Sequence, residues 1–390
     1  MKVVHTLTRI RLEEGGVVRA VLDLCASFAQ AGHEVVLIVH DDTDAPPEWK
    51  SAPPGAQGAV RIVRLDAPSR PMGLYAPAQL APAREAIAGA DVLHLHTPWE
   101  ASNLQFARLA RAEGVPYVLT IHGMLDDWSM SQRGPKKRAY LALVGRRLLE
   151  RAAYVHCTAQ AEMDQSKKWY PKGRGRVVPL IFDLSLFRDL PGPGPAQRAF
   201  PLARDERPKA LFLSRLHEKK GAEHLIDAVA LLRKEGTDCV LLIAGTGEPT
   251  YDTSLRTRVE QAGLTGCTAF LGLVVGEEKV SLFECADVFV LPTSQENFGF
   301  VAPEAMACRT PVVTTRGVDI WPELVESGGA LIVEPTARAI ADAVASLLRD
   351  DERRRTMGEK ARAWVLDHLD AGRILREYER MYADAKGVVS

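Results

Sequence analysis

The chain has 390 residues, of which 46% are hydrophobic and 25% are charged, and its formal net charge is −1 at pH 7. A single hydrophobic core stops growing near ~250 to 300 residues, so this length predicts two domains. The composition is that of a globular enzyme and excludes a disordered or fibrous protein. A near-neutral chain also lacks the basic excess of a dedicated nucleic-acid-binding protein, so no nucleic acid is expected as a partner.

The six cysteines are scattered and include no Cys-x-x-Cys pair. They are typical of buried thiols in a reducing compartment and favour neither a zinc site nor a disulfide framework. The apolar run within residues 1–16 is short and interrupted by charges, unlike a signal peptide, and no stretch of 18 uncharged apolar residues occurs. We therefore expect a cytoplasmic location, with any membrane contact made peripherally at the inner face of the cell membrane.

Short apolar runs alternate with amphipathic stretches in the first half of the chain, which predicts an α/β domain with a parallel sheet covered by helices. Helices are expected within 17–33, 103–114 and 136–152. The expected strands are 2–7, 34–40, 60–65, 91–96, 116–122, 152–158 and 176–180. This series predicts a doubly wound domain over residues 1–188. Residues 189–208 are rich in Pro and Gly without periodicity and are interpreted as a linker.

A second series begins after this linker and predicts another doubly wound domain over residues 209–369. Its strands are expected at 209–216, 238–247, 267–274, 286–293, 310–315 and 329–333. A terminal helix over 370–386 is expected to return to the first domain. Ligands of such sheets bind at the carboxyl ends of the strands, so an interdomain cleft is the expected ligand site.

Gly15 and Gly16 follow the first strand and open a helix. Glycine permits a tight turn in which the backbone approaches a ligand closely. An ordinary strand-to-helix turn would use glycines as readily, and the full Gly-x-Gly-x-x-Gly spacing of a dinucleotide site is missing. Both interpretations stay open from the residues alone.

Arg215 and Lys220 lie just beyond the first strand of the second domain. A nucleoside diphosphate gains negative charge as its bond to a sugar breaks, and fixed cations at the end of a strand would stabilise that charge. The alternative is a solvated basic loop. Lys219 is the neighbour that could be confused with Lys220.

The segment from Ser294 to Val313 places Glu296 and Glu304 on either side of an aromatic-glycine turn, with seven residues between them. The turn exposes successive N–H groups, and the helix expected from about Gly299 directs its positive end toward the cleft. Carboxylates accept hydrogen bonds from paired sugar hydroxyls. Glu296 is therefore a candidate for binding a hexose and Glu304 for binding a ribose. The alternative is a helix-capping acid and a solvated loop carboxylate.

Taken together, these features resemble the retaining GT-B glycosyltransferases of family 4, also called glycosyl transferases group 1, of the bacterial surface-polysaccharide type. The resemblance rests on Glu296-NFGFVAP-Glu304, on Arg215 with Lys220, and on the AGTGEP and ADVFVLPT stretches, and it runs along the whole chain. It implies two Rossmann-like domains with an interdomain cleft and a nucleotide-sugar donor such as a UDP- or GDP-hexose. It further implies a saccharide or lipid-linked acceptor, and no required metal or other cofactor.

The resemblance also implies a role for each matching residue. Arg215 and Lys220 would hold the diphosphate, Glu296 the hexose and Glu304 the ribose. His122, at a strand end, matches the family histidine that faces the reacting sugar, although a lone strand-end histidine is more often structural. Further donor contacts are implied for Gly15, Gly16, Gly245, Asn297, Phe298 and Gly299.

Two loops depart from the family pattern. Val177 to Asp183 reads VVPLIFD where many members have VPNG(I/V)D, which leaves a donor contact from that loop unsupported. The stretch RGVDIWPE, ending at Glu323, replaces a Gly-Gly-x-x-Glu turn. Donor specificity is therefore not assigned from this stretch.

Two weaker features follow strands of the first domain. Trp99, Asn103, Asp126 and Trp128 could stack on and hydrogen-bond an acceptor sugar, although the tryptophans could equally anchor loops. The Asp126-Asp127 pair could suggest a metal, but the sequence offers no further ligands, and no metal site is expected.

A basic stretch overlaps the helix expected at 136–152. It could be an ordinary helix of the domain with a solvated basic face. The alternative is a surface that contacts anionic lipid. The stretch contains one acid, Glu150, and the basic residues Arg133, Lys136, Lys137, Arg138, Arg146, Arg147 and Arg151.

The preferred function is a retaining hexosyltransferase of polysaccharide or glycolipid biosynthesis. One rival is a GT-B nucleotide-sugar epimerase, which would need acid and base groups around the sugar C2 atom that the sequence does not identify. The other rival is a non-catalytic nucleotide-sugar-binding protein, which would keep the binding residues and lack turnover.

Overall fold

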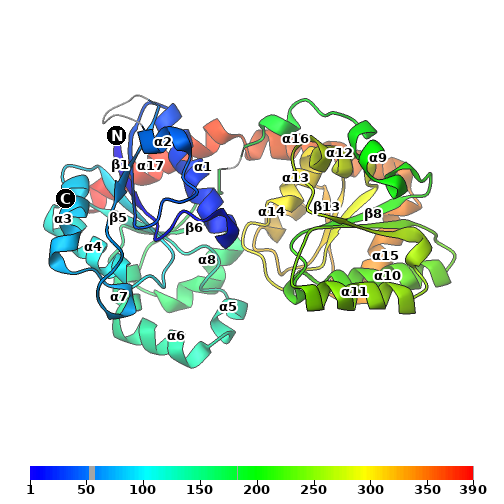
Figure 1. The fold of residues 1–390 in the computed structure, drawn as a ribbon, viewed down its shortest axis with the longest axis horizontal. Helices are drawn as coiled ribbons and strands as arrows, with labels where there is room; N and C mark the ends of the chain where they lie inside the picture. The colour runs from blue at the N-terminus through cyan, green and yellow to red at the C-terminus, as the bar shows by residue number, and fades with distance from the viewer. Residues whose placement is uncertain (52–57, 182, 390) are drawn as a thin grey trace. The chain divides into compact units, whose positions relative to one another are not determined.

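The structure is a computed structural model that describes residues 1–51, 58–181 and 183–389. The chain forms two compact units, one made of Met1–Phe182 with Ala371–Ser390 and the other of Asp183–Asp370. Each unit is built on one parallel sheet with helices on both faces (Figure 1). The expectation of two doubly wound α/β domains is confirmed.

The first unit contains a seven-stranded sheet in the order β3-β2-β1-β4-β5-β6-β7. Its strands are β1 (Lys2–Thr6), β2 (Glu34–Val39), β3 (Val60–Arg64), β4 (Val92–His96), β5 (Tyr117–Thr120), β6 (Tyr154–Cys157) and β7 (Gly175–Val177). Its helices are α1 (Gly16–Gln30), α2 (Pro47–Ser51), α3 (Ala81–Ile87), α4 (Ser102–Ala112), α5 (Asp127–Ser131), α6 (Gly134–Tyr140), α7 (Arg146–Glu150), α8 (Gln160–Ser166) and α17 (Ala371–Val389). Strand order reverses between β1 and β4, where loops from neighbouring strands diverge and leave room for a ligand.

Helix α1 shows how the apolar pattern produces these elements. Val18, Val21, Cys25 and Phe28 recur every three or four residues, so they lie on one face of the helix, and all four are buried. The last helix, α17, also belongs to this unit, and in Figure 1 it runs beside α1. Its Glu379 bonds to His33 at 2.7 Å.

The helix expected at 136–152 is divided in the structure. A π-helical turn over Leu141–Gly145 separates α6 from α7. A Cβ atom at Gly145 would lie 2.8 Å from the ring of Tyr140. The wide turn and the close aromatic ring thus make glycine necessary at this position, and π turns of this kind occur frequently at functional sites.

The second unit contains a six-stranded sheet in the order β10-β9-β8-β11-β12-β13. Its strands are β8 (Lys209–Leu213), β9 (Val240–Ala244), β10 (Thr268–Gly272), β11 (Val288–Leu291), β12 (Val312–Thr314) and β13 (Ala330–Ile332). Its helices are α9 (Gly194–Ala199), α10 (Ala222–Lys234), α11 (Pro249–Gln261), α12 (Gly276–Cys285), α13 (Val301–Ala307), α14 (Trp321–Glu326), α15 (Ala337–Leu348) and α16 (Asp351–His368). Here the strand order reverses between β8 and β11.

Residues 189–208 differ from the linker that their composition suggests. They are part of the second unit and include α9, which packs against α12. The buried Ala196 donates its backbone N–H to the Ser281 hydroxyl at 2.9 Å. Proline and glycine therefore mark short, packed turns here rather than a free connection.

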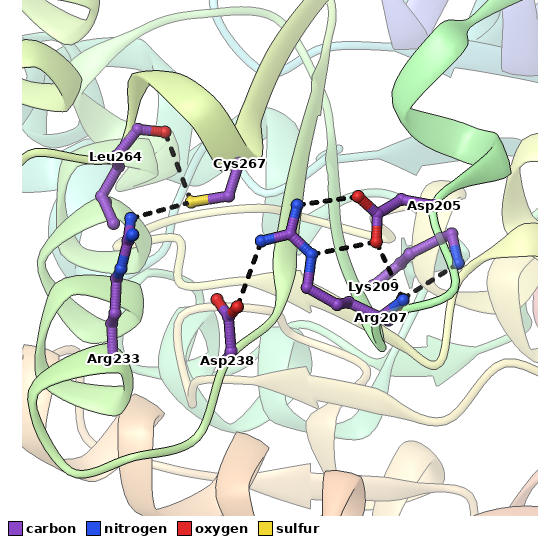
Figure 2. A network of polar contacts seen from close by, with 7 residues as sticks. All are labelled: Asp205, Arg207, Lys209, Arg233, Asp238, Leu264 and Cys267. Atoms are coloured by element: carbon purple, nitrogen blue, oxygen red, sulfur yellow. Dashed lines mark hydrogen bonds and ion pairs between the residues drawn. The ribbon is translucent and has the colours of Figure 1, made fainter.

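A polar network joins the amino ends of the strands in the second unit (Figure 2). Arg207 bonds to both oxygens of Asp205, at 2.9 and 2.7 Å, and reaches Asp238 at 3.2 Å. Lys209 donates to the Arg207 carbonyl at 3.0 Å. These contacts lie at the edge of the sheet opposite the carboxyl ends, so we assign them to folding rather than to ligand binding.

The structure shows the state and burial of each cysteine. All six are free thiols, and five of them are buried, while Cys285 is half-buried. Among the described residues, no helix combines the length and apolar composition needed to cross a bilayer.

Candidate functional site

The loops after β8 and β11 meet directly at the point where the strand order of the second unit reverses. Gly221 has φ 71°, and a Cβ atom there would lie 2.3 Å from the Pro292 carbonyl oxygen. Ser294 donates its backbone N–H to the Lys219 carbonyl at 2.8 Å. A glycine is therefore required for the close approach that brings the two loops together.

Lys220 and Glu296 form an ion pair across this loop contact. Lys220 is 4% exposed, and Glu296 remains partly open, with 25% of its side chain exposed. Burial, together with the nearby cations Lys219 and Arg215, lowers the pKa of Lys220 to about 7. The Glu296 carboxylate favours the charged form and opposes this shift. The result is a buried ammonium group that a second anion would stabilise further.

The turn that carries Glu296 is held by its backbone. Glu296 donates its N–H to the Gly317 carbonyl at 2.7 Å and accepts from the Asp319 N–H at 3.0 Å. The Asn297 side chain donates to Asp319 at 3.2 Å. Gly299 has φ 63°, a left-handed conformation that favours glycine, and α13 starts two residues later. The predicted aromatic-glycine turn is thus a rigid support for Glu296.

Glu304 lies in α13 and forms an ion pair with Lys279 of α12 at 2.7 Å. Its side chain is 13% exposed. Lys279 carries no sequence motif, and only the packing of α12 against α13 brings it here. A ribose hydroxyl at Glu304 would therefore share the carboxylate with a lysine that sequence reasoning missed.

Arg215 and Gly245 lie beside this pair of loops. Arg215 is exposed and is close enough to Lys220 to depress the pKa of that lysine. Gly245 has φ 131°, and a Cβ atom there would approach the Ser214 carbonyl oxygen at 1.8 Å. Gly245 therefore has a packing reason to be glycine, in addition to any donor contact. The structure brings together Arg215, Lys220, Gly245, Glu296, Asn297 and Gly299.

The buried Phe298 packs against Phe300, with ring centroids 5.1 Å apart. Its side chain therefore anchors the turn. Of Phe298, only the backbone N–H could therefore bind the nucleotide-sugar donor.

In the first unit, His122 follows β5 and has φ 49°, while Thr97 follows β4 and has φ 64°. Such backbone strain in residues other than glycine clusters at functional sites. His122 is 7% exposed and bonds through Nε2 to Nδ1 of His96 at 3.1 Å. Both strained residues lie just beyond the carboxyl ends of neighbouring strands of the sheet.

Gly15 and Gly16 lie at the start of α1. Gly15 has φ 97°, and a Cβ atom at either position would meet nothing within 4 Å. The positive φ explains glycine at Gly15 by conformation, and the open space at Gly16 is compatible with a ligand.

The four candidate acceptor residues have different environments. Asn103 is buried and donates to the carbonyls of His96 and Thr97 at 3.0 and 2.9 Å. Asp126 caps α5 by accepting from the Ser129 N–H at 2.5 Å. These local bonds account for both side chains without a ligand.

The two candidate tryptophans, Trp99 and Trp128, differ in how their side chains are packed and exposed. Trp99 is half-buried against the core, and its ring lies 5.2 Å from Nζ of Lys137. This packing matches the anchor interpretation. Trp128 is 37% exposed, and its predicted acceptor contact stays a prediction.

Of the two divergent loops, Val177 to Asp183 includes Phe182, which lies outside the described residues. In the other, Arg316 stacks on Trp321, with the guanidinium 5.1 Å from the ring centroid. That contact follows β12 and lies in the same loop as Gly317 and Asp319, which support the Glu296 turn.

Comparison with known proteins identifies the class. Residues 195–364 match the family Glycosyl transferases group 1, and residues 15–180 match the Glycosyl transferase 4-like domain. A D-inositol 3-phosphate glycosyltransferase of Paenarthrobacter aurescens is 30% identical over 278 residues, covering 70% of this chain and 67% of that protein.

A second relative is the GDP-mannose-dependent alpha-(1-6)-phosphatidylinositol monomannoside mannosyltransferase of Mycobacterium tuberculosis. It is 30% identical over 346 residues, covering 84% of this chain and 85% of the relative. The chain therefore belongs to glycosyltransferase family 4, and it is a glycosyltransferase.

Solved structures show the same fold. Anabaena HepE in complex with UDP aligns with a TM-score of 0.78 at 20% identity, covering 98% of this chain and 100% of HepE. Sucrose-phosphate synthase from Thermosynechococcus elongatus aligns with a TM-score of 0.76 at 24% identity, covering 98% of each chain. The expected GT-B fold is confirmed.

Proposed function

We propose that the protein is a retaining glycosyltransferase that transfers a hexose from a nucleoside diphosphate sugar to a hydroxyl of a saccharide or lipid-linked saccharide. The observation that carries the proposal is the buried Lys220 paired with Glu296 where the strand order reverses. A sugar bound through a diphosphate presents both an anion and hydroxyl groups, which match these two side chains.

In the proposed reaction, the bond between the sugar C1 atom and the diphosphate oxygen breaks, and a bond from the acceptor oxygen to C1 forms on the same face. The acceptor proton passes to a phosphate oxygen of the leaving diphosphate. Lys220 and Arg215 stabilise the charge that develops on the diphosphate, as fixed cations do where charge develops in a transition state. When the diphosphate binds Lys220, Glu296 is free to accept hydrogen bonds from the sugar.

The donor class is supported by relatives. HepE structures contain UDP-glucose or UDP with glucose, and the mycobacterial relative is named for GDP-mannose. We therefore propose a UDP- or GDP-hexose. In this proposal Lys220 and Arg215 neutralise the diphosphate, and no metal is expected at the site.

A second part of the proposal concerns the acceptor, and it rests on a cavity in the first unit. Arg108 and Arg111 of α4 line a cavity of 140 Å³ together with Arg147 and Arg151, and its wall includes the apolar Leu143. Leu143 is 74% exposed. In the described part of the chain, these four arginines form no ion pair with a carboxylate.

Cations around an apolar wall suit the boundary of an anionic membrane, where basic side chains meet headgroups and an exposed leucine meets acyl chains. We propose that this face meets anionic lipid and that the acceptor is lipid-linked, within polysaccharide or glycolipid biosynthesis. The mycobacterial relative, named for a phosphatidylinositol monomannoside, supports a lipid acceptor.

Donor turnover tests the proposed reaction against its rivals. The protein is incubated without acceptor with a panel of UDP- and GDP-hexoses, and the products are separated by anion exchange. A transferase slowly releases free hexose and nucleoside diphosphate, whereas an epimerase produces a new nucleotide sugar. Binding with no product from any donor would identify a non-catalytic binding protein and refute the proposal.

A further inference from the structure

The first unit contains a layer of five buried histidines. They come from neighbouring strands and lie on one face of the sheet, because His5 pairs in register with His94, His96 with Thr120, and Thr120 with His156. The members are His5, His94, His96, His122 and His156, each at most 7% exposed. Burial lowers the pKa of His5 and His122 to about 3 and that of His156 to about 4, so these rings are neutral at pH 7.

A neutral imidazole has one N–H donor and one acceptor nitrogen, so each hydrogen bond with a known donor determines the next one. His156 Nε2 lies 2.8 Å from the Val178 carbonyl oxygen, which only accepts, so the proton of His156 is on Nε2. Its Nδ1 must then accept from the Thr120 hydroxyl at 2.7 Å. Thr120 in turn accepts from His94 Nε2–H at 2.6 Å. His94 Nδ1 finally accepts from the Tyr382 hydroxyl at 2.6 Å.

This first chain of bonds argues against a metal in the layer. His5, His94 and His96 each place one nitrogen within 4.8 Å of the others, a grouping that could suggest a metal site. However, both nitrogens of His94 are used by Tyr382 and Thr120. A metal at this position would break at least one of these buried bonds.

The second chain of bonds runs from His5 through His96 to His122. His5 Nδ1 lies 3.2 Å from His96 Nε2, and His96 Nδ1 lies 3.1 Å from His122 Nε2. The N–H groups of this chain of bonds have two possible arrangements. Either each ring donates toward His122, or each ring donates toward His5. The choice depends on His5 Nε2, which is buried and has no hydrogen-bond partner in the described structure.

Orphaned buried N–H groups are rare in folded proteins, and a donor left without an acceptor costs free energy. We infer that His5 Nε2 is unprotonated, that His5 and His96 donate successively through Nδ1–H, and that they hold His122 in the Nδ1–H tautomer. In that state His122 accepts from His96 at Nε2 and offers Nδ1–H to a ligand. His5 and His96 are thus positioning residues, and His122 is a donor facing an oxygen of the sugar or phosphate.

The role of His122 in the reaction rests on the proposed function. His122 donates a hydrogen bond to an oxygen of the substrate and does not remove a proton from it. A neutral donor stabilises developing negative charge on that oxygen without changing its own charge. This assignment agrees with the front-side reaction, in which the acceptor proton goes to the diphosphate.

Ring-nitrogen NMR tests the tautomers without reference to activity. The full chain is labelled with ¹⁵N-histidine, and long-range ¹H–¹⁵N correlations at pH 7.5 distinguish Nδ1–H from Nε2–H rings. The expected spectrum shows Nε2–H for His94 and His156 and Nδ1–H for His5, His96 and His122. An Nε2–H pattern for His122 would overturn the inference, even if the protein proves to be an active transferase.

A matched control uses the first chain of bonds. Thr120→Val removes the hydroxyl between His94 and His156 at a comparably buried position. It should alter the signals of those two rings and leave the His122 pattern unchanged. A change of the His122 tautomer in this variant would show that the two chains are not separate and would contradict the assignment.

Two substitutions of His96 then separate positioning from packing. Asparagine places an amide near the Nδ1 position and can still donate to His122, whereas glutamine reaches only the Nε2 position. His96→Gln should lower kcat by at least ~10-fold with KM little changed, by analogy with the loss seen when a metal-bound histidine loses the partner that orients it. His96→Asn should keep kcat closer to wild type than His96→Gln does, as the conservative rescue. Equal losses in both variants, matched by equal losses in Tm, would reduce His96 to a packing role.

Discussion

Lys220, in the loop after β8, and Glu296, in the loop after β11, form an ion pair although 75 residues separate them in sequence. The pair exists because Gly221 lets the two loops approach closely. In the proposed function, this pair is the resting state of the site, and the donor diphosphate takes the place of Glu296 beside the lysine. The first three predictions follow from that exchange.

Lys220→Ala should lower turnover by at least ~100-fold, the scale of removing one group that stabilises developing charge. The fold should persist, because a lysine at a loop end is not part of the apolar core. Steady-state kinetics and thermal melting measure the two effects. A folded variant with near-wild-type activity would remove Lys220 from the mechanism.

Nucleoside diphosphate binding should take up a proton above pH 7. Burial lowers the pKa of Lys220 to about 7 in the free protein, and a bound diphosphate should raise it again. Below pH 7 the lysine is already charged, so no uptake on Lys220 is expected there. Between pH 7 and the raised pKa, affinity should fall by up to ~10-fold per pH unit, because the neutral lysine must first be protonated.

Calorimetry at pH 8 in buffers of different ionisation enthalpy measures this uptake. Lys220→Arg is the matched control, because arginine stays charged across this range and should abolish it. Proton uptake of the same size in Lys220→Arg and wild type would assign the effect to another group.

Substitutions of Glu304 and Glu296 should impair different steps, nucleotide binding and the sugar-dependent step. Glu304→Gln should weaken binding of free nucleoside diphosphate and of donor alike, by about 1 to 3 kcal/mol, if Glu304 binds the ribose. Glu296→Gln should impair the sugar-dependent step. It should bind free nucleoside diphosphate at least as tightly as wild type, since Lys220 loses its competing carboxylate. Equal losses for free nucleotide in both variants would refute the division of roles.

The lipid proposal predicts binding to anionic but not neutral vesicles, with loss at high salt. Each basic residue near such a surface contributes about 1 kcal/mol, so Arg147→Gln with Arg151→Gln should weaken binding by roughly 30-fold. Cosedimentation provides the measurement. If the wild type does not bind anionic vesicles at low salt, a soluble acceptor is the better proposal.

Arg138→Gln with Arg146→Gln provides a control that removes two charges from the same helical stretch but none from the cavity wall. A smaller loss in this control would localise binding to the cavity. Equal losses would indicate attraction to the whole basic face instead.

The strands and the two residues of the central ion pair could be identified from sequence because each lies in a local pattern, but their pairing could not. Apolar runs predicted every strand of both sheets, and the order of Lys220 before a glycine predicted a cation at the end of β8. Asp126 could also have been assigned, because an Asp followed by a short helix signals an N-cap. These features depend on neighbours in the chain.

Lys279 and the histidine layer could not be predicted in the same way. Lys279 reaches Glu304 only through the packing of α12 on α13, and His5 meets His96 only through strand register. Proline and glycine in 189–208 gave a linker interpretation because composition does not show that Ala196 is buried. Contacts that depend on tertiary packing cannot be predicted from the local sequence pattern.

The anomeric configuration of the product tests the central claim most directly. The protein is incubated with an α-linked UDP- or GDP-hexose identified by the turnover assay and with a saccharide acceptor, and the new linkage is examined by ¹H NMR. The proposed retaining transfer predicts an α-linked product, with formation lost in Lys220→Ala. A β-linked product, or transfer that is undiminished in Lys220→Ala, would contradict it.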